Sequence, residues 1–381
     1  MFLKKSIPNN ALDKFELMAK QVLPKAIYDH IAGGAGDEGA LHRNRQVYLD
    51  TILIPRILDD TSVVDVSAEI LGVQCKAPII IAPTSFHGLV SEEKEIGTAL
   101  AAKNSDCIMI VSMMANTTLE DIAQTGNSLL WFQLHVHTEH SITEQLIKRA
   151  EKSGYKAIVV TVDIPQMGIR YRDIENEFKL PTHCVPANFK NPNSGTIDLA
   201  GTNFNPTATW DDVKWLKSVT TLPLLLKGVM HPEDAEKAVE HGVDSIIVSN
   251  HGGRQFDSAP SSIEVLPQIS AIVKNQIPIL IDGGIRSGSD ILKAIILGAD
   301  AVLIGRPILW GLAVGGKQGA QRVLDCLKQE LLLAMRLVGC HSLSEVKNNR
   351  SSLVLSNRTF LGNLNARDPE NIQLETKSIA K

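Results

Sequence analysis

The sequence predicts an α/β protein built as a (β/α)₈ (TIM) barrel. Eight short apolar runs recur along the chain, and an amphipathic stretch follows each of them. Runs without polar alternation are typical of strands covered on both faces, as in a parallel sheet. Eight such units favour a closed barrel over the alternative, a doubly wound open sheet. The predicted strands are residues 79–82, 108–111, 129–132, 157–160, 224–226, 246–248, 279–281 and 302–304.

Capping signals indicate that helices connect these strands. We expect Ser289 and Asp290 to cap a helix that starts at Ile291 and stops at Gly298. Pro232 is expected in the first turn of another helix, where a missing N–H is tolerated.

A single domain is predicted over residues 1–381. Its long Pro-, Asn-, Gly- and Thr-rich stretch lacks periodicity, which predicts a mobile loop. The expected segments are an N-terminal extension (1–77, helical at about 10–33), the barrel (about 78–340), the mobile loop after the fourth strand (about 180–209) and a polar tail (about 347–381).

Composition excludes some function classes and predicts a compartment. The 381 residues are 44% hydrophobic, which is enough for a large core, and the net charge of -4 argues against a nucleic-acid partner. Five cysteines form no Cys-x-x-Cys pair, which indicates reduced thiols. The sequence shows no secretory apolar core near Met1 and no uninterrupted apolar run of membrane length. We therefore expect a cytoplasmic protein without a membrane span.

Polar residues follow all eight predicted strands, and in a parallel barrel these ends meet on one face. The alternative is a barrel without a functional site, in which polar residues follow all eight strands by chance. The residues at these ends are Pro83, Thr84, Ser85, Ser112, Gln133, His135, Thr161, Asp163, Lys227, His251, Arg254, Asp282, Gly283, Gly284, Arg286, Gly305 and Arg306.

The segment Ser249-Asn250-His251-Gly252-Gly253-Arg254 is the most informative of these ends. Histidine can accept a proton near neutral pH, and arginine offers a planar fork that matches a carboxylate. The pair therefore suggests a base beside a carboxylate clamp. The alternative is a strand that ends in a turn with a solvated arginine.

The last two strand ends predict a phosphate site. Gly283, Gly284 and Gly305 leave backbone N–H groups accessible, and Arg286 and Arg306 add positive charge. A phosphate-bearing cofactor is implied.

Other strand ends suit a planar heterocycle attached to that phosphate. Ser112, Gln133 and Thr161 offer amide and hydroxyl partners for such a ring. Lys227 could stabilise negative charge on the ring when the ring is reduced. The alternative interpretation is that Lys227 is a solvated lysine at a strand end.

Two patterns resemble other sites. The glycines of residues 34–39 match the dinucleotide-binding spacing, but they follow a helical stretch instead of a strand, so we expect a turn. His135 and His137, with His140 nearby, could bind a metal, but no third ligand has sensible spacing, so we expect no metal.

Taken together, the motifs resemble the FMN-dependent 2-hydroxy acid oxidase/dehydrogenase family, which includes glycolate, lactate and 4-hydroxymandelate oxidases. The resemblance covers residues from about 20 to 340. It is carried by Ser-Asn-His-Gly-Gly-Arg-Gln at 249–255, Ala-Pro-Thr at 82–84, Thr-Val-Asp at 161–163, Asp-Gly-Gly-Ile-Arg at 282–286 and Gly-Arg-Pro at 305–307.

This resemblance implies FMN as the cofactor and a role for each site residue. His251 would be the base and Asp163 its partner, with Arg170 and Arg254 on the substrate carboxylate. Around the flavin it implies Pro83, Thr84, Ser85, Ser112, Gln133, Thr161, Lys227, Ser249, Asp282, Gly283 and Gly284, with Arg286, Gly305 and Arg306 at the phosphate.

Four positions depart from the family pattern. His30 and His135 stand where tyrosines usually contact the substrate, and Met114 replaces a tryptophan of glycolate oxidase. Many oxidases carry alanine at Ser85. One hypothesis is that the histidines reshape the pocket for a larger or more polar acid. The alternative is drift that slightly impairs use of the ordinary acids.

The reaction expected from the resemblance is oxidation of an L-2-hydroxy acid to the 2-oxo acid, with dioxygen as electron acceptor. A dehydrogenase that uses a quinone or another carrier is the first alternative. A non-redox FMN barrel of the isopentenyl diphosphate isomerase kind and a non-enzymatic binder of a phosphorylated ligand are others. Homotetramers are usual in such families, and we expect one here.

Overall fold

The computed structural model describes residues 12–189 and 205–355. Within these residues, eight parallel strands close a barrel in the order β10-β11-β4-β5-β6-β7-β8-β9, which confirms the predicted fold class. Pairing of Val302–Ile304 with Ile79–Ile81 closes the ring. The strands are β4 (Ile79–Ile81), β5 (Ile108–Ser112), β6 (Leu130–Leu134), β7 (Ile158–Thr161), β8 (Leu224–Val229), β9 (Ser245–Val248), β10 (Ile279–Ile281) and β11 (Ala301–Ile304).

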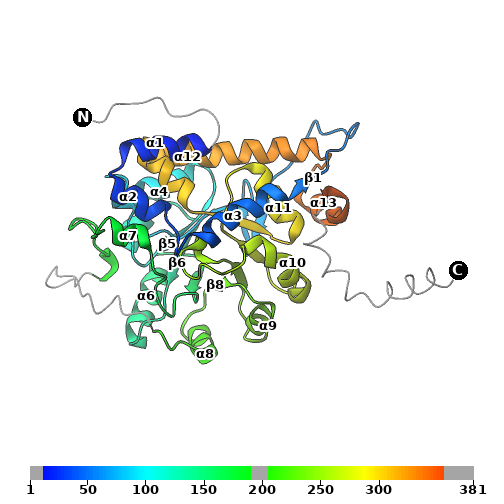
Figure 1. The fold of residues 1–381 in the computed structure, drawn as a ribbon. Helices are drawn as coiled ribbons and strands as arrows, with labels where there is room; N and C mark the ends of the chain where they lie inside the picture. Colours follow the sequence, from blue (N-terminus) through cyan, green and yellow to red (C-terminus); the bar gives the residue numbers. More distant parts are fainter. Residues whose placement is uncertain (1–11, 190–204, 356–381) are drawn as a thin grey trace.

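Helices surround the barrel (Figure 1). Pro232 stands at the first position of its helix, as expected. The expected cap at Ser289 is wrong: Ser287 is extended and its hydroxyl accepts from the Asp290 N–H at 3.1 Å, so Ser289 already lies in the first turn. The barrel helices are α4 (Lys94–Asn104), α5 (Leu119–Ala123), α6 (His140–Lys152), α8 (Trp210–Val219), α9 (Pro232–Glu240), α10 (Ser262–Val273), α11 (Gly288–Leu297) and α12 (Arg306–Leu337).

Alternation along each strand divides the core into two parts. In β4, Ile79 and Ile81 face the helices, whereas Ile80 faces the barrel interior. A hairpin of β2 (Ala68–Ile70) and β3 (Val73–Cys75) packs against that interior through Ile70. The hairpin therefore closes off apolar side chains that the barrel would otherwise leave exposed.

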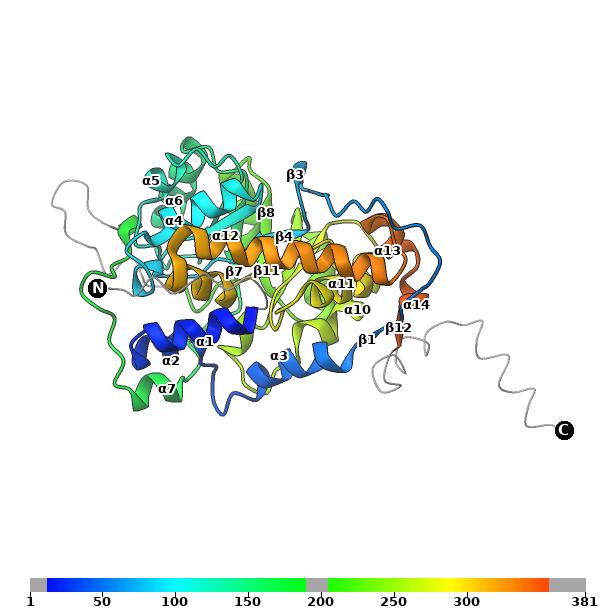
Figure 2. The ribbon, with the colours of Figure 1, turned by 90° about the horizontal axis from the view of Figure 1, so that it is seen from above.

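The N-terminal extension is helical and is packed onto the barrel. It contains α1 (Leu12–Val22), α2 (Lys25–Ala32) and α3 (Gly39–Asp50), in line with the helical pattern expected at about 10–33. Both ribbon views show α1 alongside α12 (Figures 1 and 2).

The described part of the C-terminal tail is also packed. It contains α13 (Leu343–Asn348), α14 (Arg350–Leu353) and β12 (Val354–Leu355). Strand β12 pairs with β1 (Ile52–Leu53), which links the tail to the extension.

Part of the segment expected as a mobile loop lies on the barrel. After α7 (Tyr171–Glu175), the short 3₁₀ turn Ala187–Phe189 carries a buried Asn188. Its side chain accepts from the Leu119 N–H at 2.9 Å and donates to the Met113 carbonyl at 3.0 Å. The rest of the expected loop, residues 190–204, falls outside the described residues. None of the described helices has the length and apolar character needed to cross a bilayer.

We expect Ile70→Ala to lower the free energy of unfolding by about 2–4 kcal/mol, because it leaves a cavity under the barrel interior. Ile174, which is 64% exposed, supplies the matched control, and Ile174→Ala should change stability by less than about 0.5 kcal/mol. Urea unfolding of both variants measures the difference. Equal stability of the two would contradict the packing role of the hairpin.

Candidate active site

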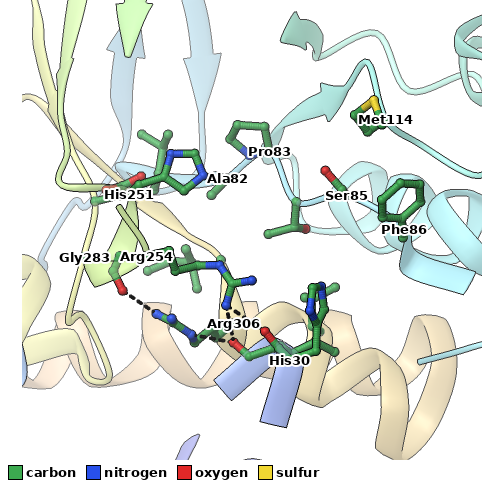
Figure 3. Close-up of a pocket in the computed structure, with 18 of the residues that line it drawn as sticks. His30, Ala82, Pro83, Ser85, Phe86, Met114, His251, Arg254, Gly283 and Arg306 are labelled. Atoms are coloured by element: carbon green, nitrogen blue, oxygen red, sulfur yellow. Dashed lines mark hydrogen bonds between the residues drawn. The ribbon is translucent and has the colours of Figure 1, made fainter. Parts of the chain in front are cut away.

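A cavity of about 420 Å³ opens at the carboxyl ends of the barrel strands. Figure 3 shows His251 on one side of it, Ser85, Phe86 and Met114 on the other, and arginines below. The predicted site residues that line it are His30, Pro83, Thr84, Ser85, Met114, His135, Arg170, Lys227, His251, Arg254, Asp282, Gly283, Gly284, Arg286, Gly305 and Arg306.

Five predicted site residues stand behind the lining. Gln133 donates to the Thr161 hydroxyl at 3.1 Å, and the Ser112 and Ser85 hydroxyls lie 3.3 Å apart. Asp163 and Ser249 contact lining residues, as described below. Ser112, Asp163 and Ser249 therefore contact residues that face the cavity, whereas Gln133 and Thr161 pair with each other.

Residues 251–253 form a turn of unusual backbone conformation. His251, Gly252 and Gly253 have φ of 56°, 64° and 75°. Positive φ is rare for histidine and costs about 1–2 kcal/mol. An amide pair holds the turn, since Asn44 and Asn250 exchange two 2.9 Å hydrogen bonds, and the Gly253 N–H donates to Asn250 Oδ1 at 3.1 Å.

His251 is oriented by Asp163. The carboxylate oxygens of Asp163 lie 3.0 and 3.2 Å from Nδ1 of His251. A carboxylate can only accept, so Nδ1 carries the proton and Nε2 is left as the basic atom. Burial acts to raise the pKa of Asp163, but the charge and hydrogen bond of His251, together with Lys227, bring that pKa below its ordinary value. Asp163 is thus a stable anion that can stabilise a protonated His251.

Lys227 is buried but well paired. Its ammonium lies 3.1 Å from Asp282 Oδ2 and donates to the Ser249 hydroxyl at 2.9 Å. Burial acts to lower the pKa of Lys227, but Asp282 and Asp163 raise it above its ordinary value. Lys227 therefore stays protonated at the cavity, as an ion pair with Asp282.

Two of the arginines are held by the C-terminal end of α2. Nη1 of Arg254 donates to the carbonyls of His30 and Gly33 at 2.7 and 2.8 Å. Arg306 donates through Nε to Ile31 and through Nη2 to Gly33, each at 2.8 Å. These carbonyls have no partner within the helix and lie at the negative end of its dipole, so they suit guanidinium donors.

Within the described residues, the cavity has too little negative charge to balance its arginines. Burial, followed by repulsion from Arg170 and Arg306, holds the pKa of Arg254 well below its ordinary value. Burial and Arg286 lower the pKa of Arg306 to about 10. Nε of Arg170 is buried without a hydrogen-bond partner in the described part of the chain. Such a site favours anionic ligands.

Helix α7 fixes the position of His30. Nδ1 of His30 lies 3.0 Å from Asp173 Oδ2, and the His30 ring stacks on Phe178 with centroids 4.2 Å apart. Asn176 donates to Asp29 of α2 at 2.9 Å and holds the two helices together. Burial, and then the charge of Arg254, lower the pKa of His30 to about 4.

His135 is buried close to His251 and Lys227. Burial, and then the charge of His251, lower its pKa to about 4, while the ring donates to the Thr161 carbonyl. Among the described residues, no group of three His, Cys, Asp or Glu side chains is placed to hold a metal ion.

The glycine-rich segment at 34–39 is a turn, as expected, and it borders the site. The Ala35 N–H donates to the Gly253 carbonyl at 2.8 Å, and the Gly36 N–H donates to the Ile169 carbonyl at 2.9 Å. A Cβ on Gly34 would lie 2.9 Å from the Gly253 oxygen. The glycines therefore permit close backbone contact with the 251–253 turn.

Several residues that shape the site were not predicted from the sequence. Asn44 pairs with Asn250 beside His251, and Asp173 contacts His30, yet nothing in the local sequence of Asn44 or Asp173 marks them. Phe178 and Ile31 also line the cavity. The one available signal is His30 itself, since a buried imidazole usually has a hydrogen-bond partner, which favours an acidic residue near it.

The model of the family described as FMN-dependent dehydrogenase matches residues 19–353. The chain belongs to this family. Its membership confirms the resemblance inferred from the motifs and makes FMN its cofactor.

Related family members are close in sequence. The chain is 46% identical over 348 residues to a peroxisomal (S)-2-hydroxyacid oxidase of Arabidopsis thaliana, covering 89% of this chain and 95% of that protein. It is 43% identical to an L-lactate oxidase of a Nostoc strain, covering 88% and 96%. A solved mandelate oxidase variant with (S)-mandelic acid superposes with a TM-score of 0.83 at 40% identity, covering 88% and 96%.

The residues present fit FMN. Among the described residues, no carboxylate pairs with Arg286 or Arg306, and Gly305 caps the N-terminus of α12, where backbone N–H groups suit a phosphate. A Cβ on Gly305 would lie 3.7 Å from Ala82 and Thr84, so the residue is not crowded by the protein. Gly284 serves packing instead, because a Cβ there would lie 2.0 Å from the Asn44 oxygen.

Arg286→Met should weaken FMN binding by about 10–100-fold, because a charge-assisted hydrogen bond contributes about 1.5–3 kcal/mol. Fluorescence titration of the apoprotein with FMN measures the dissociation constant. Arg336→Met, an exposed arginine on α12, should leave it unchanged. An unaltered constant in Arg286→Met would remove Arg286 from the phosphate site.

His135 should make stability depend on pH. Its folded pKa of about 4 lies below the ordinary 6.5, so between these values the unfolded chain binds a proton that the folded chain does not. The free energy of unfolding should therefore fall as pH drops from 6.5 towards 4, by up to about 1.4 kcal/mol per pH unit from this group.

His135→Phe should flatten that dependence by a similar amount. Urea unfolding at saturating FMN and pH 6.5, 5.5 and 4.5 measures the slope. His341→Phe, which changes an exposed histidine, is the control and should follow the unmodified protein. Parallel slopes for His135→Phe and the control would show that His135 is not buried in its neutral form.

Proposed function

We propose that this protein oxidises an (S)-2-hydroxy acid to the corresponding 2-oxo acid, with dioxygen as the final electron acceptor. The observation that carries the proposal is the convergence of His251, Arg170 and Arg254 on the cavity that also contains the FMN-binding residues. The relatives named above as 2-hydroxyacid, lactate and mandelate oxidases support it.

The two arginines and His251 have separate roles in the proposed reaction. Arg170 and Arg254 bind the substrate carboxylate, since the cavity has excess positive charge and a carboxylate matches the guanidinium fork. Nε2 of His251 takes one proton from the substrate, and Asp163 stabilises the resulting imidazolium. Bound FMN supplies the acceptor for the two electrons and the second hydrogen that the substrate loses. Lys227, which lines the same cavity, would favour negative charge on the reduced cofactor.

The side of the cavity opposite His251 decides which electron acceptor and which substrate substituent the site accommodates. Ser85 and Met114 lie there, where oxygen and the substituent would approach (Figure 3). The oxidase names of the relatives favour dioxygen, and a quinone or another carrier is the alternative. The carboxylate clamp argues against an isomerase of diphosphates, which has no carboxylate to bind.

The assembly and location remain predictions. We propose a homotetramer, which exposed apolar side chains such as Ile57, Leu58 and Val63 support, because such side chains favour burial in an interface. A cytoplasmic location is proposed from the sequence, although an Arabidopsis relative is named as peroxisomal.

The purified protein should be yellow, and (S)-lactate added under nitrogen should bleach the flavin absorbance. Readmitted air should restore the colour and yield one peroxide per acid oxidised. A protein that keeps its colour with every 2-hydroxy acid tested would refute the proposal, and bleaching without peroxide would point to another acceptor.

His251→Asn should slow flavin bleaching by about 10²–10⁴-fold, because it removes the base but keeps a polar side chain. Stopped-flow absorbance under nitrogen measures the rate, and the bound flavin spectrum reports that the variant is folded. His241→Asn, at the end of α9, is the matched control. Bleaching of His251→Asn at the control rate would exclude His251 as the base.

A further inference from the structure

His30 is held rigidly at the edge of the cavity. Asp173 lies 3.0 Å from its Nδ1, and Phe178 stacks on its ring at an interplanar angle of 12°. Asp29, Lys25 and Asn176 are linked by hydrogen bonds that tie α2 to α7. The ring therefore has one orientation, set by contacts from both helices.

This arrangement decides what His30 can offer to a ligand. A carboxylate only accepts hydrogen bonds, so the proton of the neutral imidazole is on Nδ1 and Nε2 presents a lone pair. Burial and the charge of Arg254 lower the pKa of the His30 ring to about 4, so the ring is neutral near pH 7. A lone pair repels a carboxylate oxygen, so His30 does not bind the substrate carboxylate as Arg170 and Arg254 do.

The Nε2 edge has no donor within hydrogen-bond distance among the described residues. Figure 3 shows the His30 ring directed into the cavity, with Ser85, Phe86 and Met114 beyond it. Phe178 and Leu180 also line the cavity; of these side chains only Ser85 can donate a strong hydrogen bond, and its hydroxyl lies 3.3 Å from that of Ser112. Within the described residues, no hydrogen bond to Nε2 is present in the structure.

We infer that the preferred substrate is a 2-hydroxy acid with a second hydroxyl group on the substituent of its α-carbon, and that this hydroxyl donates to Nε2 of His30. The inference rests on the proposed function and specifies its substrate class. It makes the hypothesis of a more polar acid specific, because it names one contact between Nε2 of His30 and a substrate hydroxyl. The apolar neighbours accommodate the carbon atoms of the substituent, while His30 recognises its hydroxyl.

Pairs of acids that differ by one hydroxyl test this directly. The pairs are (S)-lactate with (S)-glycerate, (S)-2-hydroxybutanoate with (S)-2,4-dihydroxybutanoate, and (S)-mandelate with (S)-4-hydroxymandelate. In at least one pair, kcat/KM for the hydroxylated acid should exceed that of its partner by about tenfold or more, because a site that binds a hydroxyl disfavours the analogue without it. The gain should lie mainly in KM, since the contact is made in the bound substrate.

His30→Phe keeps an aromatic ring but removes the acceptor. In the favoured pair it should reduce the preference to about twofold or less, through loss of activity on the hydroxylated acid. His341→Phe, at an exposed site on the tail side, should keep the preference. The 2-oxo acids give a readout without turnover: hydroxypyruvate should perturb the flavin spectrum at lower concentration than pyruvate if the glycerate pair is favoured, and His30→Phe should remove that difference.

The outcomes separate the two claims. If the acids bleach the flavin but no hydroxylated member is preferred, the inference is wrong and the proposed function stands. If the preference survives in His30→Phe, another residue reads the hydroxyl and the inference is also wrong. If no acid bleaches the flavin, the proposed function fails and the inference falls with it.

Discussion

The site depends on placing four guanidinium groups around one cavity with little negative charge to neutralise them. Of these arginines, only Arg170 has a described carboxylate within ion-pair distance, Asp173 at 4.0 Å. Arg254 and Arg306 are kept there by backbone carbonyls at the end of α2. Carbonyls satisfy N–H donors but leave the net positive charge in place, which a carboxylate would cancel. The cavity thus stays attractive to the anionic phosphate of FMN and to an acid substrate.

This constraint makes the N-terminal extension part of the active site. Helix α2 supplies the carbonyls and His30, and α3 supplies Asn44, which pairs with Asn250 beside the strained turn at 251–253. The barrel alone would leave His251 without that support. Strain of about 1–2 kcal/mol at His251 is acceptable because neighbouring hydrogen bonds determine the turn.

Burial gives the histidines of the cavity different roles. His251 has an anionic partner and a basic atom towards the cavity, so it suits proton transfer. His30 and His135 are kept neutral by burial and nearby positive charge, so they act as fixed hydrogen-bonding groups. Unlike the tyrosine hydroxyl that the family resemblance implies at these two positions, an imidazole donates or accepts according to which ring nitrogen is engaged.

The sequence by itself determined the barrel and the general location of the chemistry. Apolar runs such as 79–81 and 246–248 are covered on both faces, and parallel strands bring their carboxyl ends together, so His251, Asp282 and Arg306 had to share one face. Strand alternation directs Ser112, Gln133 and Thr161 towards the barrel interior, but local pattern could not show which partners they find there, because those partners come from other strands and loops.

Only the tertiary structure brought His30 to Asp173, 143 residues further along the chain, and the carbonyls of α2 to Arg254, more than 200 residues away. No local spacing encodes such contacts. They arise because the extension packs across the mouth of the barrel, where buried donors must find acceptors.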